Sequence, residues 1–120
     1  PVGPVFILGF SQGGAYAYSM GITHPELFSG ILAFGSLLPR HPYALFDGDD
    51  LQAARHLPVF IGHGRQDRAL DFRYGERSRE RLEKAGFSVT FHAFDGDHEM
   101  PAPLLKKAVK WMESVAEETP

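Results

Sequence analysis

A serine, an aspartate and a histidine stand where the chain could assemble acyl-transfer chemistry. Ser11 is the centre of Gly9-Phe10-Ser11-Gln12-Gly13, which matches the G-x-S-x-G pattern of a nucleophile elbow. In such an elbow a strand turns abruptly into a helix, and the turn exposes the serine hydroxyl. The amide of the next residue then points at the substrate oxygen. We therefore predict Ser11 as a nucleophile and the Gln12 backbone N–H as an oxyanion donor. The alternative is that Ser11 only caps a helix.

A serine hydroxyl needs an adjacent base before it can attack a carbonyl, and six histidines compete for that role. His98 follows residues 94–97, a loop that comes after the last predicted strand. Its position also fits the chain order Ser, acid, His of this elbow class. His63 ends a strand between two glycines and is the weaker candidate because that turn holds it close to the backbone. We predict His98 as the base.

The base needs a carboxylate that fixes its tautomer and stabilises the imidazolium. Asp67 lies in the loop after the third predicted strand, so we predict it as that acid. Asp71 is the nearest rival, but its position favours capping of the next helix. Asp95 and Asp97 stand too close in sequence to His98 to orient its ring, and we interpret them as turn residues.

The elements that must position these residues alternate between strand and helix. Apolar runs predict strands at residues 5–10, 28–36, 58–63 and 88–94, and helices are expected at 12–23, 71–85 and 101–117. A short helix capped by Asp49 or Asp50 and ending at Arg55 is expected between the second and third strands. This order predicts an α/β fold: residues 1–120 form a single domain of three α/β/α layers, with a mainly parallel sheet of about four strands. In such sheets sites form at the carboxyl ends of strands, where all three candidates lie.

Composition excludes several other classes of protein. The 120 residues carry a net charge of −3 and no long basic run, which argues against a nucleic-acid partner. The absence of cysteine excludes disulfides and thiolate chemistry. No apolar run approaches the about 20 residues of a membrane span, and no signal peptide is visible. We therefore expect no membrane insertion, a cytoplasmic location, and no metal or cofactor.

The segment between the second and third strands is expected to overhang the site. It is rich in turn signals and also carries several large apolar side chains. We predict that these side chains form a pocket for the acyl group of a small ester substrate; the alternative is that they only cover the sheet. The predicted substrate-binding residues are Leu37, Leu38 and Phe46, with Tyr43 and Leu45 as further candidates.

Taken together, four motifs resemble the phospholipase/carboxylesterase branch of the α/β hydrolases, which includes the acyl-protein thioesterases. The resemblance covers nearly the whole chain, in the order found in the family. It implies cofactor-free hydrolysis of carboxylic esters or thioesters, with Ser11 as nucleophile, Asp67 as acid and His98 as base. The matching segments are Gly9-Phe10-Ser11-Gln12-Gly13-Gly14, His24-Pro25-Glu26-Leu27-Phe28-Ser29-Gly30, His63-Gly64-Arg65-Gln66-Asp67 and Gly96-Asp97-His98-Glu99.

The chain departs from the family in length, because only ten residues precede Ser11. Family members carry further strands and helices there, including the loop that supplies the second oxyanion amide. The chain therefore resembles the C-terminal half of the fold and reads as a truncated domain. Losing one oxyanion donor typically costs about 10²- to 10³-fold in rate. The strand Val5-Phe10 is expected to be an exposed apolar edge. Through this edge the chain is expected either to pair with a second copy, forming a homo-oligomer, or to pair with another segment.

Two rival functions remain open at this level. The chain could be a catalytically impaired fragment, or an interaction domain that uses its open edge strand. It could also be a metal-dependent hydrolase, because histidines and aspartates at 63, 67, 97 and 98 are suitable ligands for zinc or manganese. The metal hypothesis leaves Ser11 unexplained, and the sequence has no H-E-x-x-H helix motif.

Overall fold

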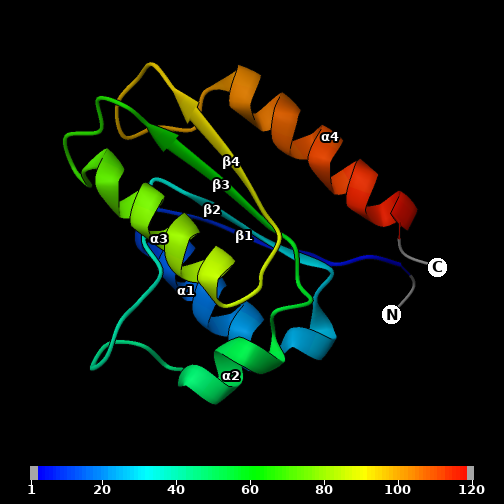
Figure 1. Ribbon diagram of the computed structural model, residues 1–120. Helices are drawn as coiled ribbons and strands as arrows, with labels where there is room; N and C mark the ends of the chain where they lie inside the picture. Colours follow the sequence, from blue (N-terminus) through cyan, green and yellow to red (C-terminus); the bar gives the residue numbers. More distant parts are fainter. Residues whose placement is uncertain (1–2, 119–120) are drawn as a thin grey trace.

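A computed structural model describes residues 3–118 of the chain, which form one parallel sheet with helices on both faces (Figure 1). The strands lie in the order in which they occur in the sequence, and each pairs in parallel with the next. This arrangement confirms the predicted α/β class and the sheet of about four strands. The strands are β1 (Phe6–Phe10), β2 (Gly30–Phe34), β3 (Val59–Gly64) and β4 (Val89–Phe94).

The helices divide into two layers because alternate side chains of each strand point to opposite faces. α1 (Gln12–Thr23) and α3 (Phe72–Lys84) cover one face, and α4 (Ala102–Glu118) covers the other (Figure 1). On β2, Ile31 and Ala33 belong to the core cluster that contains residues of α1 and α3. Leu32 and Phe34 belong to a second cluster, together with residues of α4.

The first strand forms an open edge of the sheet. All five residues of β2 are buried, whereas β1 is mostly half-buried. The side chains of Val5 and Leu8 are 44% and 45% exposed. The expected apolar edge is therefore present, and pairing of this edge with a second copy stays a prediction.

Two helix boundaries illustrate how local hydrogen bonds decide where a helix begins. The short helix α2 (Gly48–Ala53) is capped by Asp47, so the predicted cap at Asp49 or Asp50 was wrong. The Asp47 carboxylate accepts a hydrogen bond from Asp50 N–H at 2.8 Å, and Asp50 accepts one from Asp47 N–H at 3.0 Å. This reciprocal capping box satisfies two free amides at once. Asp71 caps α3 as predicted, by accepting from Arg73 N–H at 2.9 Å.

The loops after β1, β3 and β4 meet at one end of the sheet. Backbone hydrogen bonds join the second and third of these loops: Arg65 N–H donates to Phe94 O at 2.8 Å, and Gln66 N–H donates to Gly96 O at 2.9 Å. Within residues 3–118, no helix has the length and apolar character needed to cross a bilayer.

Candidate active site

Ser11 stands at a strained turn between β1 and α1. Its φ is 57° and its ψ is −123°, and it is the one described non-glycine residue with positive φ. Its backbone N–H donates to Phe34 O on the neighbouring strand at 2.8 Å, which holds the turn in place. The Ser11 side chain makes no capping hydrogen bond to α1. Its Oγ instead lies 2.9 Å from His98 Nε2, so helix capping does not account for this serine.

The strained turn requires glycine where the strand and the helix cross. A Cβ atom added to Gly9 would lie only 2.0 Å from the carbonyl oxygen of Gly13, whereas a Cβ on Gly13 would meet nothing within 4 Å. We expect Gly9→Ala to destabilise the fold by about 1–3 kcal/mol or more, because backbone must move to make room. Gly13→Ala, in the same motif, should leave the free energy of unfolding nearly unchanged. Urea unfolding of both variants tests this; equal losses would contradict it.

His98 bridges the serine and the aspartate. Its Nε2 faces Ser11 Oγ at 2.9 Å, and its Nδ1 lies 2.8 Å from Asp67 Oδ2. Because an ionised carboxylate can only accept hydrogen bonds, Nδ1 carries the proton and Nε2 is free to accept the serine proton. The imidazole also packs against Phe10, with ring centroids 4.6 Å apart. Gly35 leaves space for it, because a Cβ there would lie 3.1 Å from Nδ1.

The carboxylate of Asp67 accepts hydrogen bonds from backbone amides of its own loop. Its Oδ1 accepts from Ala69 N–H at 2.9 Å and from Leu70 N–H at 2.8 Å. Burial alone would raise the pKa of the Asp67 carboxyl, but these backbone hydrogen bonds and the contact with His98 together lower that pKa below its ordinary value. The group therefore remains a carboxylate at neutral pH, as a partner for an imidazolium must.

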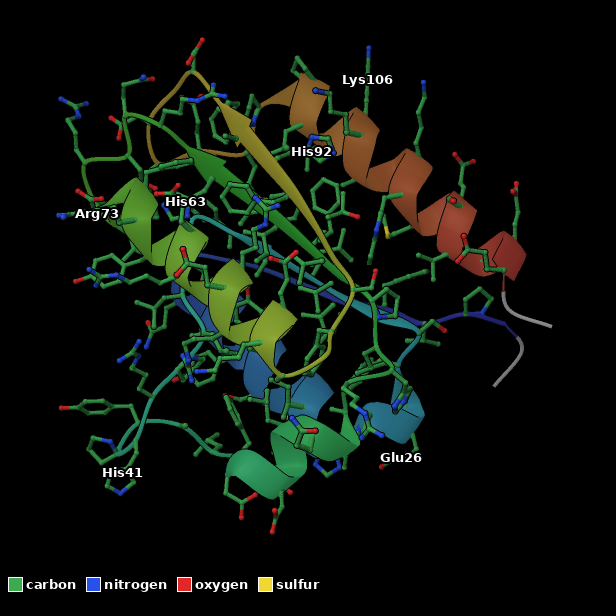
Figure 2. All side chains as sticks on the ribbon, viewed as in Figure 1. Glu26, His41, His63, Arg73, His92 and Lys106 are labelled. Atoms are coloured by element: carbon green, nitrogen blue, oxygen red, sulfur yellow. The ribbon has the colours of Figure 1, made fainter. Side chains whose placement is uncertain are left out.

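His63, the weaker candidate base, is fully buried and does not reach the serine. It belongs to β3, and its ring packs against Gly75 of α3 (Figure 2). Its Nε2 lies 2.8 Å from Leu70 O and 3.4 Å from Asp67 Oδ2. His63 therefore tethers the loop that carries the acid. The sequence signal for this role is only the histidine at the strand end, which does not reveal what its ring contacts.

Asp97 has a structural role that the sequence did not reveal. We interpreted it as a turn residue, and it does lie in the turn before His98. In addition, its carboxylate accepts from Arg68 N–H at 2.8 Å and from Arg68 Nε at 2.7 Å. These hydrogen bonds join the loop that carries His98 to the loop that carries Asp67. The partners stand 29 residues apart, so no local pattern could have paired them.

The Asp97–Arg68 contact predicts a pH-dependent stability. Hydrogen bonds from Arg68 lower the pKa of the Asp97 carboxyl to about 2, against about 3.9 for an unfolded chain. Because the pKa of this carboxyl is lower in the folded protein than in the unfolded chain, the ionised Asp97 stabilises the folded state above about pH 4. This contribution is lost as the pH falls toward 2. We expect Asp97→Asn to have a lower urea midpoint than the unchanged chain at pH 6, with a gap that narrows between pH 4 and pH 3.

The arginine partner provides the control for that experiment. Arg68→Gln should show a smaller gap that narrows over the same pH range, because the backbone N–H of residue 68 still donates to Asp97, and the double variant should lose little more than Asp97→Asn. A gap that stays constant down to pH 3 would contradict this account of the contact.

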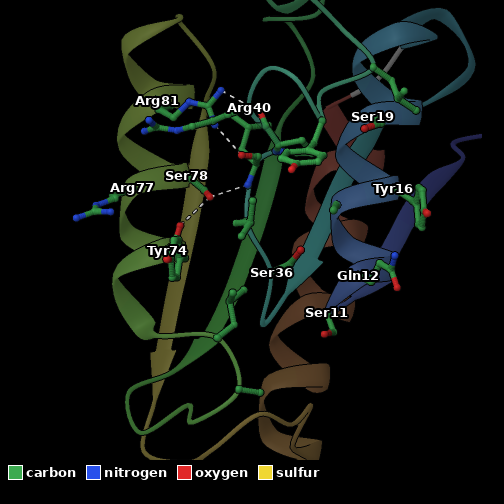
Figure 3. A pocket seen from close by; sticks show the side chains of 18 of the residues that line it. Ser11, Gln12, Tyr16, Ser19, Ser36, Arg40, Tyr74, Arg77, Ser78 and Arg81 are labelled. Atoms are coloured by element: carbon green, nitrogen blue, oxygen red, sulfur yellow. Dashed lines mark hydrogen bonds between the residues drawn. The ribbon is translucent and has the colours of Figure 1, made fainter.

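A cavity of about 790 Å³ opens beside Ser11 and His98 (Figure 3). That the cavity takes an acyl group stays a prediction, but two of the predicted substrate-binding residues, Leu37 and Leu38, line it. Phe46 does not: it packs against the core cluster that contains residues of α1 and α3, so its predicted place in the pocket is corrected. Some hydrophobic side chains of the segment after β2 face the core and others face the cavity, and the sequence alone does not show which side each one faces. The apolar part of the lining also includes Pro39, Tyr43, Leu45 and Leu70.

The arrangement does not resemble a metal centre. Within residues 3–118, no group of three or more histidine, cysteine or acidic side chains is placed to hold an ion. His63 and His98 instead face Asp67 from two directions, and Asp97 faces Arg68.

The parallel sheet and the strand-to-helix elbow define an α/β-hydrolase fold, and comparison with solved structures agrees. Arabidopsis thaliana SOBER1 superposes with a TM-score of 0.79 at 27% identity, covering 92% of this chain and 52% of that one. The sequence profile described as phospholipase/carboxylesterase matches residues 1–116. The chain belongs to the phospholipase/carboxylesterase family.

Two curated relatives show how far this likeness extends. A probable carboxylesterase of Oryza sativa subsp. japonica is 30% identical over 117 residues, which are 92% of this chain and 41% of that protein. Acyl-protein thioesterase 1 of Cryptococcus neoformans is 32% identical over 91 residues, which are 74% of this chain and 37% of that protein. The chain thus spans less than half the length of these two relatives.

Proposed function

We propose that this chain carries the catalytic triad of a serine hydrolase that cleaves carboxylic esters or thioesters, with Ser11 as nucleophile, His98 as base and Asp67 as acid. One observation carries the proposal: a continuous hydrogen-bond relay runs from Ser11 Oγ through His98 to Asp67, with contacts of 2.9 and 2.8 Å. Family membership supports the same class of reaction. No metal or cofactor takes part in this chemistry.

In the proposed reaction, Ser11 Oγ attacks the acyl carbonyl carbon while its proton passes to His98 Nε2. The resulting tetrahedral intermediate collapses and the C–O or C–S bond to the leaving group breaks. His98 returns the proton to the departing alcohol or thiol. Water then attacks the acyl-enzyme, His98 takes and returns a second proton, and the acid is released with the Ser11 hydroxyl restored. Asp67 stays ionised and stabilises the imidazolium in both halves.

The oxyanion is proposed to bind the backbone N–H of Gln12. Gln12 begins α1, and the first amides of a helix have no acceptor within the helix. The positive end of the helix dipole adds to this effect. In this fold class a second donor comes from a loop that precedes the elbow in the chain. The alternative of an impaired hydrolase applies to these 120 residues tested by themselves, because they cover 41% and 37% of the two relatives' length.

Labelling with a fluorophosphonate separates these two functions. The purified 120-residue chain, with its mass and oligomeric state checked by light scattering, is treated with the probe and digested for mass spectrometry. Hydrolysis of p-nitrophenyl butyrate is measured on the same sample. Labelling at Ser11 together with turnover is the expected result. Labelling without turnover favours the impaired hydrolase, and a folded chain that takes up no label contradicts the proposal.

A further inference from the structure

Two arginines lie at one end of the cavity, away from the nucleophile, and a third arginine contributes to its lining. Arg40, Arg77 and Arg81 belong to the cavity lining, which contains no aspartate or glutamate. In Figure 3, Arg40 and Arg81 lie side by side at the end of the cavity opposite Ser11. Arg77 lies one turn before Arg81 on α3, and its guanidinium points away from the cavity. The proposed reaction uses none of them.

Arg81 is fixed in place by the backbone of the segment that follows β2. Its Nη1 donates to Leu38 O at 2.6 Å and its Nη2 donates to Pro39 O at 3.2 Å (Figure 3). The Leu38 N–H is fixed in turn by Ser78 Oγ at 2.8 Å. Arg40 follows directly and begins a tight turn, because its carbonyl accepts from Tyr43 N–H at 2.7 Å. These hydrogen bonds fix the Arg81 guanidinium and the backbone of Arg40, so Arg40 extends from an ordered turn beside Arg81.

These positive charges lack negative partners. Within residues 3–118, Arg40, Arg77 and Arg81 form no ion pair. Burial lowers the pKa of Arg81, and the positive charge of Arg40 lowers it further. Other arginines of the chain do pair with carboxylates. Those that pair with an aspartate or glutamate are Arg65, Arg68, Arg73 and Arg79. Like charges held together without a counter-ion are unfavourable, and an anion bound between them would relieve that repulsion.

We propose that the arginine end of the cavity binds an anionic group of the substrate, remote from its scissile bond. This inference rests on the proposed function and names its substrate class: an ester or thioester whose apolar chain ends in a carboxylate or phosphate. Arg40 is exposed and donates no hydrogen bond within the described residues, so all of its guanidinium N–H groups are free for such an oxyanion. The apolar walls then hold the chain between that anion and Ser11.

Matched ester pairs that differ by one charge test the proposal. With the anion on the acyl side, the pair is p-nitrophenyl hydrogen adipate and its methyl ester. With the anion on the leaving group, the pair is 3-(4-acetoxyphenyl)propanoate and its methyl ester. We expect the anion to raise kcat/KM by about tenfold in one of the two pairs at low salt, and that pair identifies the side that faces the arginines. The preference should fall as salt is raised to 0.5 M, because exposed charges are screened.

Two variants locate the preference. Arg40→Gln should reduce at least threefold the ratio of kcat/KM for the anionic ester to kcat/KM for its methyl ester, while Arg81 stays in place on α3. Arg79→Gln is the matched control. It removes one charge from the same helix, but its guanidinium pairs with Glu83 at 3.3 Å and does not line the cavity. Equal kcat/KM for both members of both pairs, or the same loss in Arg79→Gln, overturns the proposal.

A binding measurement keeps this test independent of catalysis. The mono-4-nitroanilide of adipic acid and the neutral primary amide made from it contain no ester bond, so the site is not expected to turn them over, and their dissociation constants can be measured by calorimetry or NMR titration. Tighter binding of the acid, lost in Arg40→Gln, supports the anion site even if no ester is hydrolysed. Ester turnover together with equal binding of the two amides supports the proposed hydrolase and contradicts the proposed anion site.

Discussion

Replacing Ser11 with alanine is expected to lower the rate of ester hydrolysis by about 10⁴- to 10⁶-fold and to abolish fluorophosphonate labelling. The magnitude follows from the loss of the attacking atom, since removal of one member of a triad costs about as much as removal of the whole unit. The fold should persist. Alanine keeps the Cβ that already sits at the strained φ of 57°, and the backbone bond to Phe34 is unaffected.

The measurement compares purified variants for kcat, labelling and thermal midpoint. Ser88→Ala is the matched control, because Ser88 is exposed and lies just before β4, remote from the cavity. Its rate should equal that of the unchanged chain. Loss of activity in both serine variants would indicate a general effect of purification or folding. Retained hydrolysis in Ser11→Ala would remove this residue from the mechanism.

Replacing Asp67 with asparagine is expected to lower kcat by about 10⁴-fold while the chain stays folded. An asparagine oxygen can keep the hydrogen bonds from Ala69 and Leu70, at 2.9 and 2.8 Å. Its amide group would then face His98 Nδ1 and donate to it. That contact favours the tautomer with the proton on Nε2, which cannot accept the proton of Ser11. The loss therefore arises from the tautomer of the base.

Asp71→Asn provides the control for this experiment. It makes the same chemical change four residues later, at the N-cap of α3, where asparagine caps as well as aspartate. We expect its kcat and unfolding midpoint to match those of the unchanged chain. NMR of the imidazole nitrogens reports the tautomer of His98 directly. A decrease smaller than tenfold in Asp67→Asn, with the tautomer unchanged, would contradict the assigned role.

The sequence by itself determined the fold class and the three residues of the relay. Alternating strands and helices leave little choice beyond a parallel sheet, and the loops after parallel strands gather at one end of it. The elbow motif also predicts a sharp turn from local sequence alone. The close backbone approach at Gly9 and the strained backbone of Ser11 both involve residues only a few positions apart in the chain. Asp71 was predicted as a cap for the same reason, since its partner Arg73 is two residues away.

Only the tertiary structure decided which side chains face the cavity and which partners meet across the chain. Phe46 turns toward the core, whereas Leu37 and Leu38 face the cavity, because an irregular segment has no periodicity that assigns its side chains to a face. Asp97 meets Arg68, and Arg81 holds the carbonyls of residues 38 and 39, across separations of about 30 to 40 residues. Such contacts depend on how the strands and helices pack together, which no local sequence pattern records.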